Sequence, residues 1–161
     1  MKRAVAVGVD GTIAMRVGGT IDRKHSHPVS IVARVRLMSD GRWTGYALGY
    51  NTGIETYMGR SVVLDAGKIR ILVAERSAMT VEPELFRSHG IAPERMRIVV
   101  VKSPNGFRAA YQSLTQKMIL VDTPEVSTPN LKAIPYRRVP RPLYPLDERL
   151  KFSVNEETLT R

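Results

Sequence analysis

The residues with the clearest potential for chemistry lie in the stretch VVVKSPNGFRAAY, residues 99–111. A run of β-branched apolar residues ends at Lys102, a Ser-Pro-Asn-Gly turn follows, and the apolar spacing becomes helical at Phe107. In α/β proteins, a strand that ends in such a turn and continues as a helix often holds an anion, because the first backbone N–H groups of the helix are unpaired. Lys102 and Arg108 add positive charge, so this elbow is a candidate site for a carboxylate or a phosphate.

The same elbow also has a purely structural interpretation. Ser-Pro-Asn-Gly is a favourable turn sequence, and Phe107 is expected to pack into the core. Neither a general base nor a metal ligand accompanies Lys102 and Arg108, so the elbow could bind a ligand but offers no catalyst. From the residues alone, both interpretations stay open.

The histidines do not form a recognisable metal site. His25 and His27 are two residues apart in a polar loop, and no third ligand follows at a zinc spacing such as HExxH, so we predict two surface histidines. His89 precedes Gly90, where a cation would suit the negative end of a helix. The chain has no cysteine and no GxSxG nucleophile motif. These residues therefore predict no catalytic residue and no metal ligand.

Alternating apolar and polar residues predict antiparallel strands in the first half of the chain. In the segment 29–38, Ala33 and Val35 belong to the apolar face, and a Ser-Asp-Gly turn ends the strand. A second turn, Asp-Ala-Gly-Lys, separates two apolar runs and indicates a hairpin over 61–76. An earlier strand is expected within 11–17, and turns with short strands are expected between 45 and 59.

The second half changes to a pattern of strand, helix, strand, helix and strand over residues 69–124. After the first of these strands we expect a helix at 80–90 capped by Thr80, a strand at 95–103, a helix at 106–116 and a strand at 117–124. Both later strands are apolar almost throughout, which is typical of burial on two faces of a parallel or mixed sheet. The predicted fold class is α+β, with antiparallel strands followed by a β-α-β-α-β segment.

The C-terminal part is rich in proline. Four prolines fall within residues 135–145, which predicts an extended strap laid across the surface and not a helix or a strand. Residues 148–161 are expected to form a flexible tail.

The totals are those of an ordinary globular domain with a surplus of positive charge. The 161 residues fit one domain, and the formal net charge is +10. The basic residues are spread along the chain with no motif of nucleic-acid recognition, which leaves a generally basic surface or one that faces an acidic partner. No apolar stretch is long enough to span a membrane and no signal-like segment opens the chain, so a cytoplasmic location is expected.

Four motifs in order resemble the C-terminal domain of the MlrC-like metallopeptidases, the microcystinase C family. They are VGGTIDRKHSHPVSIVARVRLMSDGRW, VVVKSPNGFRAAYQSL, ILVDTPEVSTPNL and IPYRRVPRPLYPLD. The resemblance covers roughly residues 8 to 147, and it identifies residues 1–147 as a single domain of this kind. The opening MKRAVAVGVDGT resembles the middle of a family chain, where a helix runs into the first strand of this domain.

The resemblance implies a zinc-dependent peptidase in the full-length family. In such proteins a larger N-terminal domain carries the zinc ligands and catalytic acids, and peptides are hydrolysed. The chain is therefore expected to be a C-terminal domain or a truncated member, without its own cofactor, that partners the metal-bearing domain and is not catalytic alone. The resemblance places six residues as candidates for the wall of the interdomain substrate cleft: Lys102, Ser103, Asn105, Gly106, Phe107 and Arg108. An exposed apolar or basic patch is expected where the other domain docks.

Three positions depart from the family pattern. Gly106 stands where many members have histidine, Glu125 where glycine is frequent, and Thr20 where lysine is common. These departures limit any transfer of substrate specificity. Two other functions stay open: a free-standing module that binds small anions or acidic partners, and weak, salt-dependent association with nucleic acid through the basic surface.

Overall fold

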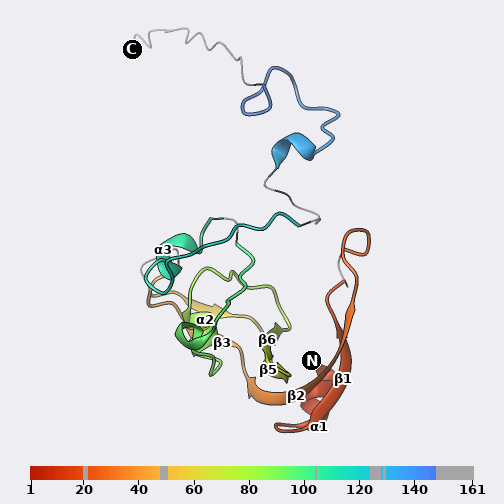
Figure 1. The fold of residues 1–161 in the computed structure, drawn as a ribbon, viewed down its shortest axis with the longest axis vertical. Coiled ribbons are helices and arrows are strands. Elements are labelled where there is room, and N and C mark those ends of the chain that lie inside the picture. The colour runs from red at the N-terminus through yellow and green to blue at the C-terminus, as the bar shows by residue number, and fades with distance from the viewer. Residues whose placement is uncertain (20–21, 48–50, 104, 124–127, 129, 148–161) are drawn as a thin grey trace, which may run out of the picture. The chain divides into compact units, whose positions relative to one another are not determined.

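The structure is a computed structural model that describes residues 1–19, 22–47, 51–103, 105–123, 128 and 130–147. The chain divides into two compact units, Met1–Val121 and Asp122–Arg161 (Figure 1). The first unit contains the sheets, and the second contains the proline-rich segment.

The main sheet of the first unit is antiparallel and has four strands in the order β1-β2-β5-β6. The strands are β1 (Thr12–Val17), β2 (Val29–Ser39), β5 (Ser61–Ala66) and β6 (Ile69–Ala74), and a short helix, α1 (Lys2–Val7), precedes β1. A smaller antiparallel sheet pairs β3 (Arg42–Thr44) with β4 (Glu55–Tyr57). The antiparallel strands, both predicted turns and the helix that leads into the first strand are confirmed, as is the α+β class.

Strand β6 separates two hydrophobic cores. Ile71 and Val73 pack against a core formed by α1 and the strands, whose buried residues are Ala4, Ile13, Ala33, Val35, Val62 and Leu64. Leu72 and Ala74 pack against a second core of Trp43, Met58 and Leu85. This alternation follows from the two-residue period of a strand, and it covers the β5–β6 end of the sheet on both faces. Ala33 and Val35 are buried as their pattern predicted.

The helix predicted at 80–90 is shorter than expected. It is reduced to α2 (Glu84–Arg87), and Pro83 stands at its N-cap. Thr80 is not the cap: its hydroxyl is buried without a hydrogen-bond partner among the described residues. Proline at position 83 has no N–H to offer and suits the start of a helix, which explains why the helix begins after it and not at Thr80.

The crossover segment also differs from its prediction. Residues 95–103 and the described part of 117–124 are not in strands, and the helix expected at 106–116 is reduced to α3 (Arg108–Tyr111). The two apolar runs are extended but lack a ladder. β-branched residues favour an extended backbone, whereas a strand also needs a neighbour to bond to, and the described part of the chain provides none for these runs. The described residues therefore contain no β-α-β-α-β unit on a mixed sheet.

The second unit contains one short 3₁₀ helix among its described residues, Leu131–Ala133. Beyond it, a turn is closed by Arg141 and Asp147: the Arg141 guanidinium and the Leu143 amide both donate to the Asp147 carboxylate. These donors lower the pKa of Asp147 to about 2. The strap over the surface stays a prediction, and the predicted tail at 148–161 lies outside the described residues.

In the described part of the chain, no helix has the length and apolar character to cross a bilayer.

The turn after β2 requires glycine at position 41. Gly41 has a φ of 77°, and a Cβ there would collide with the carbonyl group of Gly59. Gly53 has a similar φ of 75°, but a Cβ there would meet nothing within 4 Å. We expect Gly53→Ala to lower the free energy of unfolding by about 1 kcal/mol, from backbone strain alone. Gly41→Ala should lower it by about 3 kcal/mol or more, because the backbone must also move.

Urea unfolding followed by circular dichroism measures both variants. Equal losses for Gly41→Ala and Gly53→Ala would contradict the close approach of the turn to Gly59.

Candidate functional site

The elbow predicted as a site lies between an extended segment and α3. Its backbone turns through a hydrogen bond from the Arg108 N–H to the Asn105 carbonyl, 3.1 Å long. Lys102, Asn105, Gly106 and Arg108 are exposed. Ser103 is half-buried and Phe107 is buried, so the elbow presents four of the six predicted residues to solvent.

The elbow is anchored by an aromatic cluster. Phe107, Ala110 and Tyr111 are buried together, and the two rings lie 6.5 Å apart at a tilt of 59°. The Tyr111 hydroxyl donates a hydrogen bond of 3.0 Å to the backbone carbonyl of Glu82, in the segment that leads into α2. These contacts give the elbow a fixed base, as the structural interpretation of Phe107 expected.

Gly106 packs closely on the same segment. A Cβ at position 106 would lie 3.0 Å from Val81 Cγ1 and 3.3 Å from Ser103 Oγ. A larger side chain at this position therefore requires a small shift of Val81. Glycine lets the elbow backbone approach Val81 directly.

The electrostatics of the elbow are modest. The helix that follows it has four residues, too short for the pronounced dipole that would attract an anion. The positive groups are the exposed side chains of Lys102 and Arg108, and the guanidinium carbon of Arg108 lies 5.8 Å from the centre of the Phe107 ring. Such an arrangement can attract a carboxylate, and it contains no group that could act as a general base. Ligand binding by the elbow stays a prediction.

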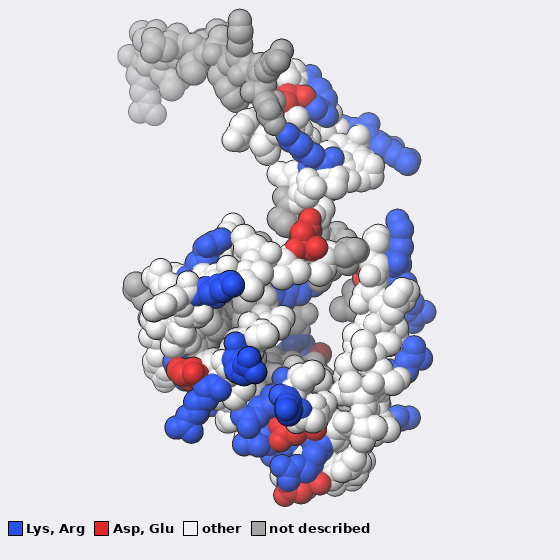
Figure 2. Space-filling view, in the orientation of Figure 1, with Lys and Arg blue, Asp and Glu red and all other residues white. Residues whose placement is uncertain are grey.

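Basic side chains elsewhere in the first unit are distributed and partly paired. Lys and Arg are scattered over the face shown in Figure 2, some of them beside acidic residues. Asp65 on β5, for example, is shared by Arg34, Arg36 and Arg70 at 3.7, 3.2 and 3.5 Å. The net charge of +10 is therefore a general property of the surface and does not define a site.

Neither of two surface hollows in the described part of the chain is lined by the six predicted residues. One, of about 420 Å³, lies beside α2 and α3; its lining residues are Tyr46, Ala47, Glu84, Arg87, Ala109, Ala110, Gln112 and Ser113. The charges in this hollow are already paired, because Arg87 contacts both Glu84 and Glu94. These two carboxylates raise the pKa of Arg87. The hollow offers polar groups but no unpaired base.

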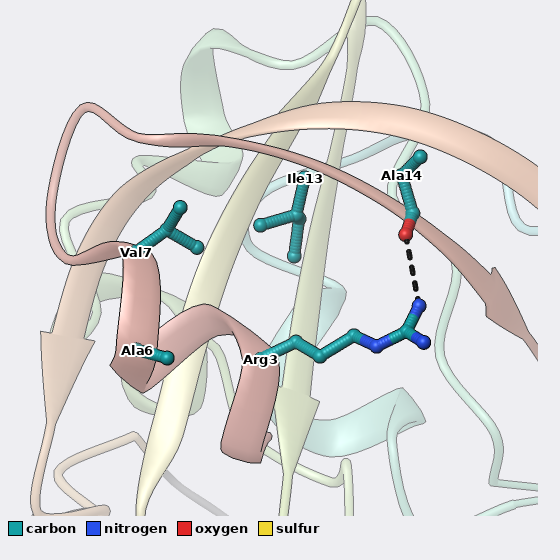
Figure 3. Close-up of a pocket in the computed structure, with 5 residues that line it drawn as sticks. All are labelled: Arg3, Ala6, Val7, Ile13 and Ala14. Atoms are coloured by element: carbon teal, nitrogen blue, oxygen red, sulfur yellow. Dashed lines mark hydrogen bonds between the residues drawn. The ribbon is translucent and has the colours of Figure 1, made fainter.

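The other hollow is shallow and mostly apolar. It measures about 330 Å³ and lies between α1 and β1, lined by Arg3, Ala6, Val7, Ile13 and Ala14 (Figure 3). The Arg3 guanidinium reaches across it to the Ala14 carbonyl at 3.4 Å. This group of residues has no nucleophile, base or metal ligand.

The interior contains a polar pair, Ser61 and His89, that the sequence did not predict. Ser61 Oγ lies 2.7 Å from His89 Nε2, and His89 Nδ1 lies 2.7 Å from the Leu85 carbonyl. Because a carbonyl only accepts, Nδ1 carries the proton and Ser61 donates to Nε2. The pair has the form of a serine and its base, but both residues are fully buried, so a substrate cannot reach it. His89 does cap the end of α2, as predicted, but it does so from a buried position.

Glu82 is also fully buried. One carboxylate oxygen accepts a hydrogen bond from the Asn51 N–H at 3.2 Å, and the other has no partner among the described residues. A Cβ at Gly45 would lie 2.5 Å from that second oxygen, so the carboxylate rests against the Gly45 backbone. No local sequence signal distinguishes Glu82 from Glu84, which does lie in the first turn of α2.

The described residues do not fit a zinc ion. His25 and His27 are exposed, as predicted, and His25 Nδ1 lies 2.9 Å from Asp22. The backbone N–H of His25 lowers the pKa of Asp22. Within the described part of the chain, no three His, Asp or Glu side chains come together in a group that could hold a metal ion.

Comparison with known proteins agrees with the motif resemblance. The family model described as MlrC C-terminus matches residues 1–138. A solved structure, from Mesorhizobium sp. BNC1 and described as a "Putative metallopeptidase", has the same fold with a TM-score of 0.78 at 24% identity. The match covers 94% of this chain and 30% of that chain, so this chain spans less than a third of its neighbour's length. No curated protein matches.

Burial of Tyr111 predicts a dependence of stability on alkaline pH. Removal of its hydroxyl from water raises the pKa of Tyr111 above its ordinary value. The neutral phenol thus stabilises the fold below about pH 10, and this contribution is lost as the pH rises towards the folded-state pKa. Tyr111→Phe should cost about 1 kcal/mol at pH 8, through loss of the bond to Glu82.

The difference between wild type and Tyr111→Phe should shrink by pH 11, because only the wild type releases a proton on unfolding. Urea unfolding at both pH values measures this difference, with the exposed Tyr144→Phe as the control. A difference that stays constant between the two pH values would contradict the burial of the Tyr111 hydroxyl.

Proposed function

Because the chain belongs to the MlrC C-terminus family, we propose that it serves as the C-terminal domain of a metal-dependent peptidase and forms one wall of the substrate cleft. The observation that carries this proposal is the family match over residues 1–138, nearly the whole chain. The shared fold with the protein described as a "Putative metallopeptidase" supports it. In this proposal the chain does not catalyse alone.

The proposed division of labour follows from the side chains that are present. The described residues do not fit zinc, and the elbow has no general base. We therefore assign the metal ligands and catalytic acids to a polypeptide segment outside the matched region, which corresponds to the larger part of the Mesorhizobium protein. The peptide substrate, zinc and the metal-bearing domain are the proposed partners of this chain.

The elbow is the proposed contribution to the cleft. Phe107 fixes its base, while Lys102, Asn105, Gly106 and Arg108 are exposed in front of it. A peptide carries at least one carboxylate, and an arginine can bind a carboxylate with two parallel hydrogen bonds. The proposed role of Arg108 is to orient the substrate, not to take part in bond cleavage.

The chain alone should not retain zinc. After dialysis against zinc-containing and then zinc-free buffer, elemental analysis should find well below one zinc per chain, since the described residues include no ligand cluster. The same preparation should not hydrolyse a linear peptide. A His25→Ala/His27→Ala double variant serves as the control for weak surface binding. Stoichiometric zinc that survives dialysis, together with hydrolysis, would overturn the proposed function.

The role of Arg108 can be tested in a complete two-domain protein that contains this chain. Arg108→Ala should raise KM for a linear peptide about tenfold and change kcat less than about twofold, because binding is lost without loss of a reacting group. Arg16→Ala on β1 removes the same charge from an exposed position and is the matched control. Equal effects of both variants, or a fall in kcat at constant KM, would contradict the assignment.

A further inference from the structure

Two extended segments of the first unit expose rows of apolar side chains. In residues 97–101, Ile98 and Val100 are 81% and 83% exposed. In residues 118–121, Ile119, Leu120 and Val121 are 71%, 61% and 72% exposed. We call these the open segments. Such runs of large apolar side chains in contact with water usually mark an interaction surface.

The opposite side of each open segment is already packed. Val99 and Val101 contact the cluster of Phe107, Ala110 and Tyr111, and Met118 contacts the same cluster. In residues 98–101 the side chains thus alternate between the cluster and solvent, with the period of a β-strand. Residues 98–101 therefore have the burial pattern of a strand that is covered on one face only.

The backbone of the open segments lacks partners as well: no hydrogen bond joins residues 97–101 or 118–121 to any other described part of the first unit. Unpaired N–H and C=O groups on an apolar extended segment readily accept another strand. Exposure alone is a weaker sign: Val32 is 68% exposed, but its backbone lies within β2 and pairs with Ala14 of β1.

We infer that the open segments dock the remainder of the metallopeptidase, which adds strand backbone to residues 97–101 and covers the outward apolar rows. This inference rests on the proposed function and names the surface through which the two parts meet. The Mesorhizobium protein has further polypeptide that could supply such a strand, since about 70% of its chain lies outside the match. No other described part of the first unit covers the rows.

Charge favours that occupant over a second copy of this chain. Arg97 lies within the open segments, Arg95, Lys102 and Lys117 flank them against one acidic neighbour, Asp122, and the whole chain has a net charge of +10. Two copies would bring like charges together, which disfavours association. An acidic rim around the docked strand would complement these residues.

The test compares the isolated chain with a chimera in which this chain replaces the matching part of the Mesorhizobium protein. Hydrogen exchange followed by mass spectrometry reads the backbone amides directly. In the isolated chain, residues 97–101 and 118–121 should exchange as fast as unstructured peptide. In the chimera, their exchange should slow at least about tenfold, because paired amides open only with the interface.

Val100→Lys tests the apolar row, and Val32→Lys is the matched control. Both replace an exposed valine with the same charge, so neither should unfold the chain. Val100→Lys should abolish the slow exchange in the chimera, whereas Val32→Lys should leave it unchanged. Identical exchange in chimera and isolated chain would overturn the inference. So would slow exchange in the isolated chain that grows with its concentration, which would assign the surface to a second copy.

These outcomes are separate from the test of the proposed function. Zinc retention and peptide hydrolysis by the isolated chain would overturn the proposed function without reference to amide exchange. Unprotected open segments in a chimera that still hydrolyses peptide would overturn this inference alone.

Discussion

The hydrogen bond between Ser61 and His89 connects the main sheet to the segment around α2, on which the elbow rests. Ser61 belongs to the buried strand β5, and His89 follows α2. Through His89 Nδ1 the same ring holds the Leu85 carbonyl, so the end of α2 is tied to the sheet by one side chain. Both groups are fully buried, and removal of either would leave a polar atom without a partner, at a cost of about 1–3 kcal/mol. The elbow is connected to the sheet through this same segment, because Tyr111 donates to the Glu82 carbonyl.

Much of the first unit could be predicted from local pattern. The β5–β6 hairpin follows from two apolar runs around a Gly-containing turn, and the burial of Ala33 and Val35 follows from the alternation in β2. The family resemblance rested on ordered motifs and was confirmed by the match over residues 1–138. These features share one property: each is encoded in residues that are neighbours in the chain.

What sequence reasoning missed depends on contacts between distant residues. His89 and Ser61 are 28 residues apart, and nothing near either one indicates that they meet in the interior. Glu82 is an acidic residue of the kind expected in the first turn of a helix. Pro83, however, shifts the start of the helix to Glu84, and Glu82 is buried against Gly45. The strands predicted at 95–103 and 117–124 failed for the opposite reason. Their local preference is strong, but pairing is a property of two segments, and the described chain has no second segment to offer them.

The open segments and the elbow share one physical base. Val99, Val101 and Met118 pack on the Phe107 cluster, and Phe107 is itself part of the elbow. A strand that paired with residues 97–101 would restrict the backbone that carries Val99 and Val101, and these valines would then hold the Phe107 ring in one position. Since the Arg108 guanidinium lies near that ring, the same restriction would reduce the range of positions open to it. In the proposed arrangement, docking at the open segments and orientation of the Arg108 side chain would be coupled through a single hydrophobic cluster.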